Sequence, residues 1–169
     1  IGRDGVTQMG LEDISIMRSL PNMSVINPST PNQTKFFVKY LCDNVISNPH
    51  YLRLGRQPVP ELYDDDFDFE FGKVIVHKEG GSGTVFSTGC VLNDVLLATK
   101  DLDISVVDVP NIKPLDFEGI KMHLKGDVFT VEDHSIIGGL GSTIAEVMSE
   151  GGTNSRLHRI GVKDCFPES

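Results

Sequence analysis

The sequence lacks three features that would mark particular classes of protein. No apolar run approaches the roughly 20 residues needed to cross a bilayer, so no membrane-spanning helix and no membrane partner are expected. No basic segment followed by an apolar one is visible, as a secretory signal would require. Basic residues are outnumbered, with 15 Lys and Arg against 24 Asp and Glu and a net charge of -9. That balance argues against nucleic acid as a partner, because phosphate binding favours a basic surface.

Cysteine is also scarce. Cys42, Cys90 and Cys165 lie far apart and form no CxxC motif for metal binding or redox chemistry. An odd, sparse set is typical of a reducing compartment rather than of a secreted disulfide scaffold, so we expect a cytoplasmic protein. Cys42 and Cys90 have apolar neighbours, which predicts packed thiols rather than reactive ones.

The sequence does contain enough apolar material for a substantial core. Of its 169 residues, 39% are hydrophobic, which suffices for one large or two small domains. The chain begins at Ile1 rather than at methionine, and both ends have the composition of loops. We therefore expect it to be a fragment or the ordered part of a longer polypeptide.

The first 56 residues predict two helices and two short strands. Residues 11–19 place apolar side chains on one helical face. Thr30 is a good helix N-cap with Pro31 at the first helical position. Strands are expected at residues 22–26 and 50–54.

Residues 57–72 have the composition of a linker between domains. Pro58 and Pro60 disfavour a regular element. An acidic run follows at residues 64–70; it could bind a metal, although consecutive carboxylates on a linker are usually solvated. A few aromatic residues should pin the segment to the rest of the molecule.

From Lys73 onward, strands and helices alternate. This order predicts an open, mostly parallel sheet with helices on both faces, that is, a three-layer α/β/α fold. The expected strands cover residues 74–76, 84–87, 104–107, 128–131 and 157–162, and the expected helices cover residues 91–100, 117–124 and 137–148.

Two polar motifs near residue 135 could carry chemistry. The glycine-rich segment 138–141 follows a strand and opens a helix, where backbone NH groups could bind an anion. Its spacing is not GxGxxG, and a tight turn is the favoured interpretation. Glu132 and His134 are expected in a polar turn at the carboxyl edge of the sheet. They could act in acid–base catalysis, contact a partner subunit or cap the helix.

A second set of candidates lies in the first 56 residues. Arg53 and Arg56 flank Gly55 where a strand runs into a loop. A guanidinium there could bind phosphate or carboxylate through paired hydrogen bonds, although a surface ion pair is the commoner use. Asp4 and Gln8 lie in a glycine-containing loop and by themselves indicate only a turn.

Several motifs, in the right order, resemble the C-terminal section of transketolases. Residues 2–8 resemble the family's G-E-D-G-x-T/S-H-Q loop, and residues 52–56 resemble its strand and phosphate-binding arginine. Segments 131–142 (VEDHSIIGGLGS) and 161–166 (GVKDCF) resemble two further family motifs. The resemblance covers nearly the whole chain and is closest to the separately encoded C-terminal transketolase subunits of some prokaryotes.

The resemblance implies an activity and a division of the chain. Transketolases transfer a two-carbon ketol unit between sugar phosphates, as in the pentose phosphate pathway, with thiamine diphosphate and a divalent metal, Mg or Ca. Residues 1–56 would be part of the pyrimidine-binding domain, itself a thiamine-diphosphate-type α/β domain, and residues 73–169 the C-terminal domain. The cofactor's diphosphate and metal would be held by an N-terminal part or subunit, so this chain alone is expected to be inactive. The implied assembly is a homodimer or a dimer of heterodimers.

Three site residues carry over from the resemblance. Asp4 matches the aspartate that recognises a substrate hydroxyl, and Arg56 matches the arginine that binds the sugar phosphate. Gln8 stands where the family usually has a histidine at the reaction centre, and glutamine cannot carry a proton at neutral pH. Glu132 and His134 would then be structural or interface residues, because the family's C-terminal domain has no assigned chemical role.

Two alternatives remain open from the sequence. Deoxyxylulose-phosphate synthases and the beta subunits of 2-oxoacid dehydrogenases share the same two domains. The chain could also be a non-catalytic assembly or regulatory module, an interpretation that only Gln8 favours.

Overall fold

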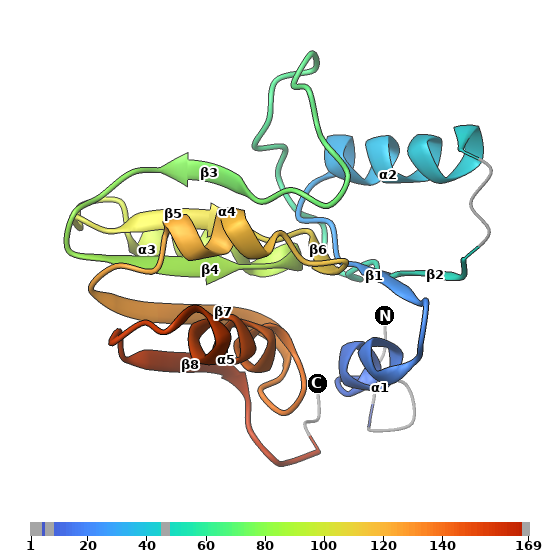
Figure 1. The fold of residues 1–169 in the computed structure, drawn as a ribbon. Helices are drawn as coiled ribbons and strands as arrows, with labels where there is room; N and C mark the ends of the chain where they lie inside the picture. Colours follow the sequence, from blue (N-terminus) through green and yellow to red (C-terminus); the bar gives the residue numbers. More distant parts are fainter. Residues whose placement is uncertain (1–4, 6–8, 45–47, 167–169) are drawn as a thin grey trace.

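The computed structural model describes residues 5, 9–44 and 48–166. Its strands form two sheets, and the amino-terminal helices and strands lie at one end of the molecule (Figure 1). In chain order they are α1 (Asp13–Ser19), β1 (Ser24–Ile26), α2 (Pro31–Asp43), β2 (His50–Leu52), β3 (Ile75–Lys78), β4 (Gly83–Ser87), the 3-10 turn Gly89–Val91, α3 (Leu92–Ala98), β5 (Ser105–Asp108), β6 (Asn111–Lys113), α4 (Phe117–Met122), β7 (Asp127–Ser135), α5 (Leu140–Gly151) and β8 (Leu157–Val162).

The larger sheet has five strands in the order β3-β5-β4-β7-β8. Strands β5, β4, β7 and β8 are parallel, and β3 joins the edge antiparallel to β5. Alternate residues face opposite layers, as strand geometry requires. Val85 and Val106 pack with α3 on one face, whereas Phe86 and Val107 pack with α4 and α5 on the other. The predicted α/β fold with a mostly parallel sheet and helices on both faces is confirmed.

The smaller sheet has three strands in the order β2-β1-β6. β1 and β2 are parallel, with Val25 opposite Tyr51, and β6 pairs antiparallel with β1. Strand β6 was not predicted, and it comes from the carboxyl-terminal half of the chain. The first 56 residues therefore complete their sheet with a strand from beyond residue 110.

The prediction for the start of α2 is confirmed. Thr30 is the N-cap, its side chain accepts a hydrogen bond from the Gln33 amide, and Pro31 is the first helical residue. This arrangement supplies one of the acceptors that a helix start needs.

The polar turn predicted at residues 132–135 is wrong. These residues continue β7 as far as Ser135, and their side chains alternate between buried and half-buried positions. The next helix accordingly begins at Leu140 rather than at Ile137, which is 56% exposed. The packed environment predicted for Cys42 is also wrong, because its thiol is exposed. Apolar neighbours in sequence do not bury a residue on the outer face of a helix.

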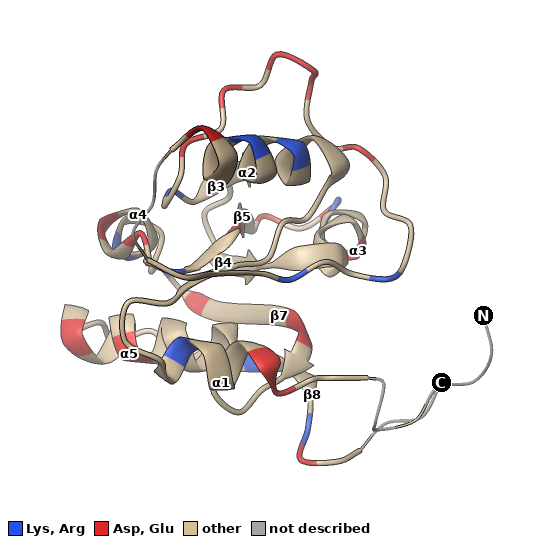
Figure 2. Cartoon of the chain, turned by 90° about the vertical axis from the view of Figure 1, so that its right-hand side faces the viewer, with Lys and Arg blue, Asp and Glu red and all other residues tan. Residues whose placement is uncertain are grey.

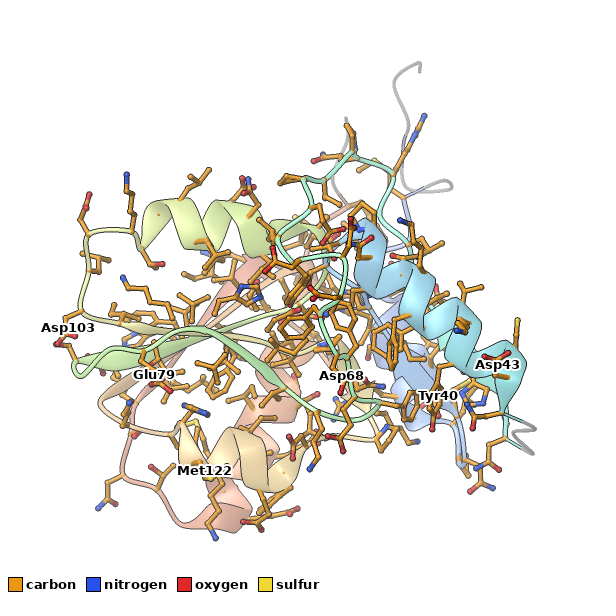
Figure 3. All side chains as sticks on the ribbon, turned by 90° about the horizontal axis from the view of Figure 1, so that it is seen from above. Tyr40, Asp43, Asp68, Glu79, Asp103 and Met122 are labelled. Carbon is orange, nitrogen blue, oxygen red and sulfur yellow. The ribbon has the colours of Figure 1, made fainter. Side chains whose placement is uncertain are left out.

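The segment 57–72, called the linker below, contains no helix or strand and is held by aromatic packing. It loops above α2 (Figure 1), and its acidic residues form the uppermost part of Figure 2. Phe71 stacks on Tyr40 of α2 with ring centroids 4.6 Å apart, and Phe69 contacts both Phe36 and Tyr63. Seen from above, Asp68 and Tyr40 lie on the α2 side, away from Glu79 and Asp103 (Figure 3). The predicted aromatic pinning is confirmed.

Within the described part of the chain, every helix is too short or too polar to cross a bilayer.

Candidate functional site

A charged cluster joins the amino-terminal elements to β7. The Arg53 Nη1 atom donates to both carboxylate oxygens of Asp133, at 2.8 and 2.9 Å, and its Nε atom donates to Asp13 Oδ2 at 3.0 Å. Tyr51 donates its hydroxyl to Asp13 at 2.7 Å, and the Cys90 thiol lies 3.2 Å from Asp133 Oδ2. We call these five residues the Arg53 cluster.

Three separate elements and the 3-10 turn Gly89–Val91, which contains Cys90, supply this cluster. Asp13 opens α1, Tyr51 lies in β2, and Asp133 lies in β7. Arg53 follows β2, and its backbone NH donates to Ile26 O at 2.8 Å, which continues the pairing with β1. The positions of α1, the end of β2 and β7 therefore depend on one guanidinium.

The electrostatics of the Arg53 cluster favour a charged guanidinium at Arg53 and protonated side chains at Tyr51 and Cys90. Burial by itself would lower the pKa of Arg53, but Asp133 and Asp13 outweigh burial and raise it. Burial first, and then Asp133, raises the pKa of the Cys90 thiol to about 12. Burial and Asp13 likewise raise the pKa of Tyr51 to about 12. Cys90 is therefore a protonated donor rather than a nucleophile, as predicted.

The Glu132 side chain caps the start of α5. Its two carboxylate oxygens accept hydrogen bonds from the backbone NH groups of Leu140 and Gly141, at 2.7 and 2.9 Å. A Cβ atom at Gly139 would overlap Glu132 Oε2, which explains the glycine there. The helix start is thus capped by an internal carboxyl group, which agrees with a tight turn rather than a site for an external anion. Burial raises the pKa of Glu132 to about 7.

His134 is fully buried and neutral. Burial lowers its pKa, and its Nδ1 atom lies 2.6 Å from the carbonyl oxygen of Ser135, which requires the Nδ1–H tautomer. Its Nε2 atom lies 3.7 Å from Asp13 Oδ1. A side chain with no exposed surface cannot meet a substrate without rearrangement. The geometry of Glu132 and His134 therefore favours structural roles.

A second polar cluster surrounds Asp108, which ends β5 and is fully buried. Its carboxylate accepts from Ser29 Oγ at 2.7 Å, from Gln33 Nε2 at 2.9 Å and from the Tyr63 hydroxyl at 2.8 Å. His77 Nε2 lies 2.8 Å from the same hydroxyl. We call these five residues the Asp108 cluster. Sequence reasoning missed it, although a carboxylate ending an apolar strand was an available signal.

Of the three predicted site residues, the structure describes one. Asp4 and Gln8 lie outside the described residues. Arg56 is exposed in the loop after β2. A groove of 550 Å³ runs along this loop. It is lined by residues 54, 55 and 57–59, by the start of α2 and by Cys90 of the Arg53 cluster.

The described residues form no cluster that could hold a metal ion. Among them, no three His, Cys, Asp or Glu side chains gather in a way that could hold a metal ion. Asp13 and Asp133 are engaged by Arg53, and the acidic residues 64–66 and 68 of the linker are exposed. This donor set does not fit a divalent metal with its diphosphate.

Comparison with known proteins covers both halves of the chain. Residues 1–61 match the transketolase pyrimidine binding domain, and residues 72–169 match the transketolase C-terminal domain. A protein of Methanocaldococcus jannaschii described as a transketolase C-terminal section is 38% identical over 100% of this chain and 55% of its own length. The 6-deoxy-6-sulfo-D-fructose transketolase subunit SqwH of a Clostridium species is 37% identical over 98% of this chain and 52% of its own.

A solved structure of a related protein has the same fold as this chain. A split gene transketolase, described as an inactive β4 tetramer, superposes with a TM-score of 0.87 and 40% identity over 94% of this chain and 55% of its own. The chain thus spans about half the length of the relatives that it matches.

Proposed function

This chain belongs to the transketolase family, and we propose that it acts as the C-terminal half of an enzyme that transfers a two-carbon ketol unit between sugar phosphates. The observation that carries the proposal is the match over the full chain, at 37% and 38% identity, to the C-terminal sections and subunits of divided transketolases. We further propose the division into residues 1–56, the linker 57–72 and residues 73–169. Sugar-phosphate metabolism of this kind fits the cytoplasm.

We propose that an N-terminal partner holds the cofactor. Thiamine diphosphate is the cofactor of this family, and it supplies a stabilised carbanion for carbon–carbon chemistry when it is bound. The described residues of this chain form no metal cluster, so the divalent metal, Mg or Ca, is assigned to the partner together with the diphosphate. The isolated chain should then be inactive.

The residues of this chain would bind the substrate. Arg56 is exposed, and its chain neighbours Gly55 and Gln57 line the groove of 550 Å³, so its guanidinium could pair with the phosphate of a sugar bound there. Asp4 would accept a hydrogen bond from a substrate hydroxyl. Gln8 would donate or accept a hydrogen bond near the reacting carbon but could not move a proton there.

The assembly that we favour is a homodimer or a dimer of heterodimers with the N-terminal partner. A related split gene transketolase is described as an inactive tetramer of its β chains. By analogy, this chain would self-associate without the partner and gain activity only on mixing.

The test is reconstitution with the N-terminal subunit and thiamine diphosphate, followed by an assay of two-carbon transfer to an aldose phosphate. We expect activity in the mixture, and a rise of the KM for the phosphorylated acceptor by about 100-fold in Arg56→Gln, since a lost charged hydrogen bond corresponds to roughly this factor. Arg156→Gln, which makes the same change at an exposed arginine outside this groove, is the matched control. Normal kinetics in Arg56→Gln would contradict the role of Arg56.

The non-catalytic alternative rests on Gln8. Under that hypothesis the chain would assemble with the partner and the mixture would transfer no ketol unit, while Gln8→His would restore none. Transfer of pyruvate-derived units instead of ketol units would favour the deoxyxylulose-phosphate synthase or 2-oxoacid dehydrogenase alternatives.

A further inference from the structure

We propose that Arg53 is a positioning residue: by binding Asp133 of β7 and Asp13 of α1, it determines the position of the loop that carries Arg56. The inference rests on the proposed role of Arg56 in substrate binding. It deepens that role, because it gives the C-terminal domain a part in placing the substrate's phosphate.

The loop is fixed at three points immediately before Arg56. The Arg53 backbone NH is bonded to Ile26 O at 2.8 Å, and the Arg53 side chain is bonded to two carboxylates. At Gly55 a Cβ atom would lie 3.3 Å from the Cβ of Cys90, so the backbone runs close to the 3-10 turn of the C-terminal domain. Arg56 is the next residue, so these contacts restrict where its backbone lies.

The geometry at Arg53 requires a guanidinium. One nitrogen meets both oxygens of Asp133 while another meets Asp13, and the side chain is only 11% exposed. A lysine ammonium is a point charge without this fork, and it could not hold both carboxylates in the same directions. The Arg53 cluster thus fixes both the orientation of the guanidinium and its distances to the two carboxylates.

The same guanidinium links the two segments that carry the proposed substrate residues. Asp13 lies five positions after Gln8, and Arg53 lies three positions before Arg56. A shift at Asp133 would therefore be transmitted through Arg53 to α1 and to the loop after β2. Because binding sites lose function when their groups move by about 1 Å, such a shift should be visible in substrate binding.

The substitution that tests the proposal is Asp133→Asn in the reconstituted enzyme. It keeps the size of the side chain and one acceptor oxygen but removes a charge. We expect the KM for a phosphorylated acceptor to rise by about tenfold, with kcat within about twofold and no change in KM for a non-phosphorylated aldehyde. Equal effects on both acceptors, or no effect, would overturn the proposal.

The matched control is Glu146→Gln. It breaks the ion pair between Glu146 and Arg18, which also connects α1 with the C-terminal domain but does not touch residues 53–56. We expect this variant to leave both KM values unchanged. A rise like that of Asp133→Asn would mean that any loosening of α1 produces the effect, which would contradict a specific role for Arg53.

A double-mutant cycle decides whether Asp133 acts through Arg56. In an Arg56→Gln background, Asp133→Asn should change the KM for the phosphorylated acceptor by less than about twofold, because coupled residues are not additive. Full additivity of the two effects would show that Asp133 acts independently, and the proposal would fail.

A readout that needs no catalysis separates this proposal from the proposed function. Trypsin cleaves after arginine and lysine, so cleavage after Arg56 reports the mobility of the loop, and cleavage after the exposed Lys100 serves as an internal reference. We expect Asp133→Asn to speed cleavage after Arg56 about tenfold relative to Lys100, since local opening controls proteolysis, and Glu146→Gln to leave the ratio unchanged. If the wild-type mixture transfers no ketol unit, the proposed function fails, whereas an unchanged cleavage ratio overturns the positioning role itself.

Discussion

The Arg53 and Asp108 clusters both join the amino-terminal elements to the larger sheet, but they do so by different physics. Asp108 is fully buried and accepts three hydrogen bonds from neutral donors. Arg53 carries a full charge between two carboxylates that are 19% and 24% exposed. Buried donors that lose their acceptor cost much stability, whereas partly solvated ion pairs add little stability. The first cluster should therefore determine stability and the second should determine geometry.

The largest expected effect is that of Asp108→Ala. The variant would leave Ser29 Oγ, Gln33 Nε2 and the Tyr63 hydroxyl without their acceptor in the core. We expect the free energy of unfolding to fall by about 3–5 kcal/mol, measured by urea denaturation. Asp101→Ala, at an exposed position, is the control. A loss below about 1 kcal/mol would show that solvent or side-chain rearrangement replaces the carboxylate.

Glu132→Gln should change how stability depends on pH. The folded-state pKa of Glu132 is raised to about 7 from 4.5, so the proton is bound more tightly in the folded chain. Its contribution to stability is fully present below pH 4.5 and is lost as the pH rises towards 7, on the order of 3 kcal/mol. The stability of the wild type minus that of Glu132→Gln should therefore decrease from pH 5 to pH 7.5.

The lowered pKa of His134 has the opposite sign and costs stability in acid. Taking the difference at each pH subtracts the part of the His134 titration that does not depend on Glu132, whose Oε2 atom lies 3.8 Å from His134 Nδ1. Urea denaturation at four pH values suffices, and a difference that stays constant with pH would contradict the pKa assigned to Glu132.

Arg53→Lys should have a smaller effect on stability and a distinctive response to salt. We expect a loss of about 1 kcal/mol at low ionic strength, because the partners are partly solvated, and a smaller loss in 1 M NaCl. The loss in Asp108→Ala should stay the same in salt, since its partners are neutral. Equal salt responses in the two variants would remove the distinction between the clusters.

The smallest expected effect concerns the linker. Phe71→Leu removes the stack on Tyr40, whose rings are 7° from parallel, and should cost about 0.5–1.5 kcal/mol beyond the change in buried area. Urea denaturation measures the loss, with Phe166→Leu as a control, since Phe166 is 79% exposed. An equal loss in both variants would mean that the linker is not held by this contact.

The sequence predicted the fold class because the apolar pattern is local. Strand and helix alternation after Lys73 and the Thr30–Pro31 helix start both depend on neighbouring residues. Strand β6 could not be predicted in this way, because three residues form a strand only where β1 offers an unpaired edge. The prediction missed the extension of β7 to Ser135 for the same reason: beyond an irregularity in the register after Val131, β7 pairs with β8 again at Ser135, opposite Val162.

The candidate site was less predictable than the fold. Arg53 was identified as a group that could bind an anion, but its actual anions, Asp13 and Asp133, are 40 and 80 positions away in the chain. The Asp108 cluster likewise gathers residues from four distant segments. Such contacts depend on tertiary packing, which a single sequence does not display. The roles of Asp4, Gln8 and Arg56 stay predictions from the family resemblance.

The most direct test of the account is two-carbon transfer measured on three samples: this chain alone, the N-terminal subunit alone and their equimolar mixture, each with thiamine diphosphate and Mg²⁺. Sedimentation velocity on the same samples reports their assembly. The account predicts ketol transfer only in the mixture, together with a new complex that contains both chains. Ketol transfer by this chain alone, or a complex of both chains without transfer, would contradict it.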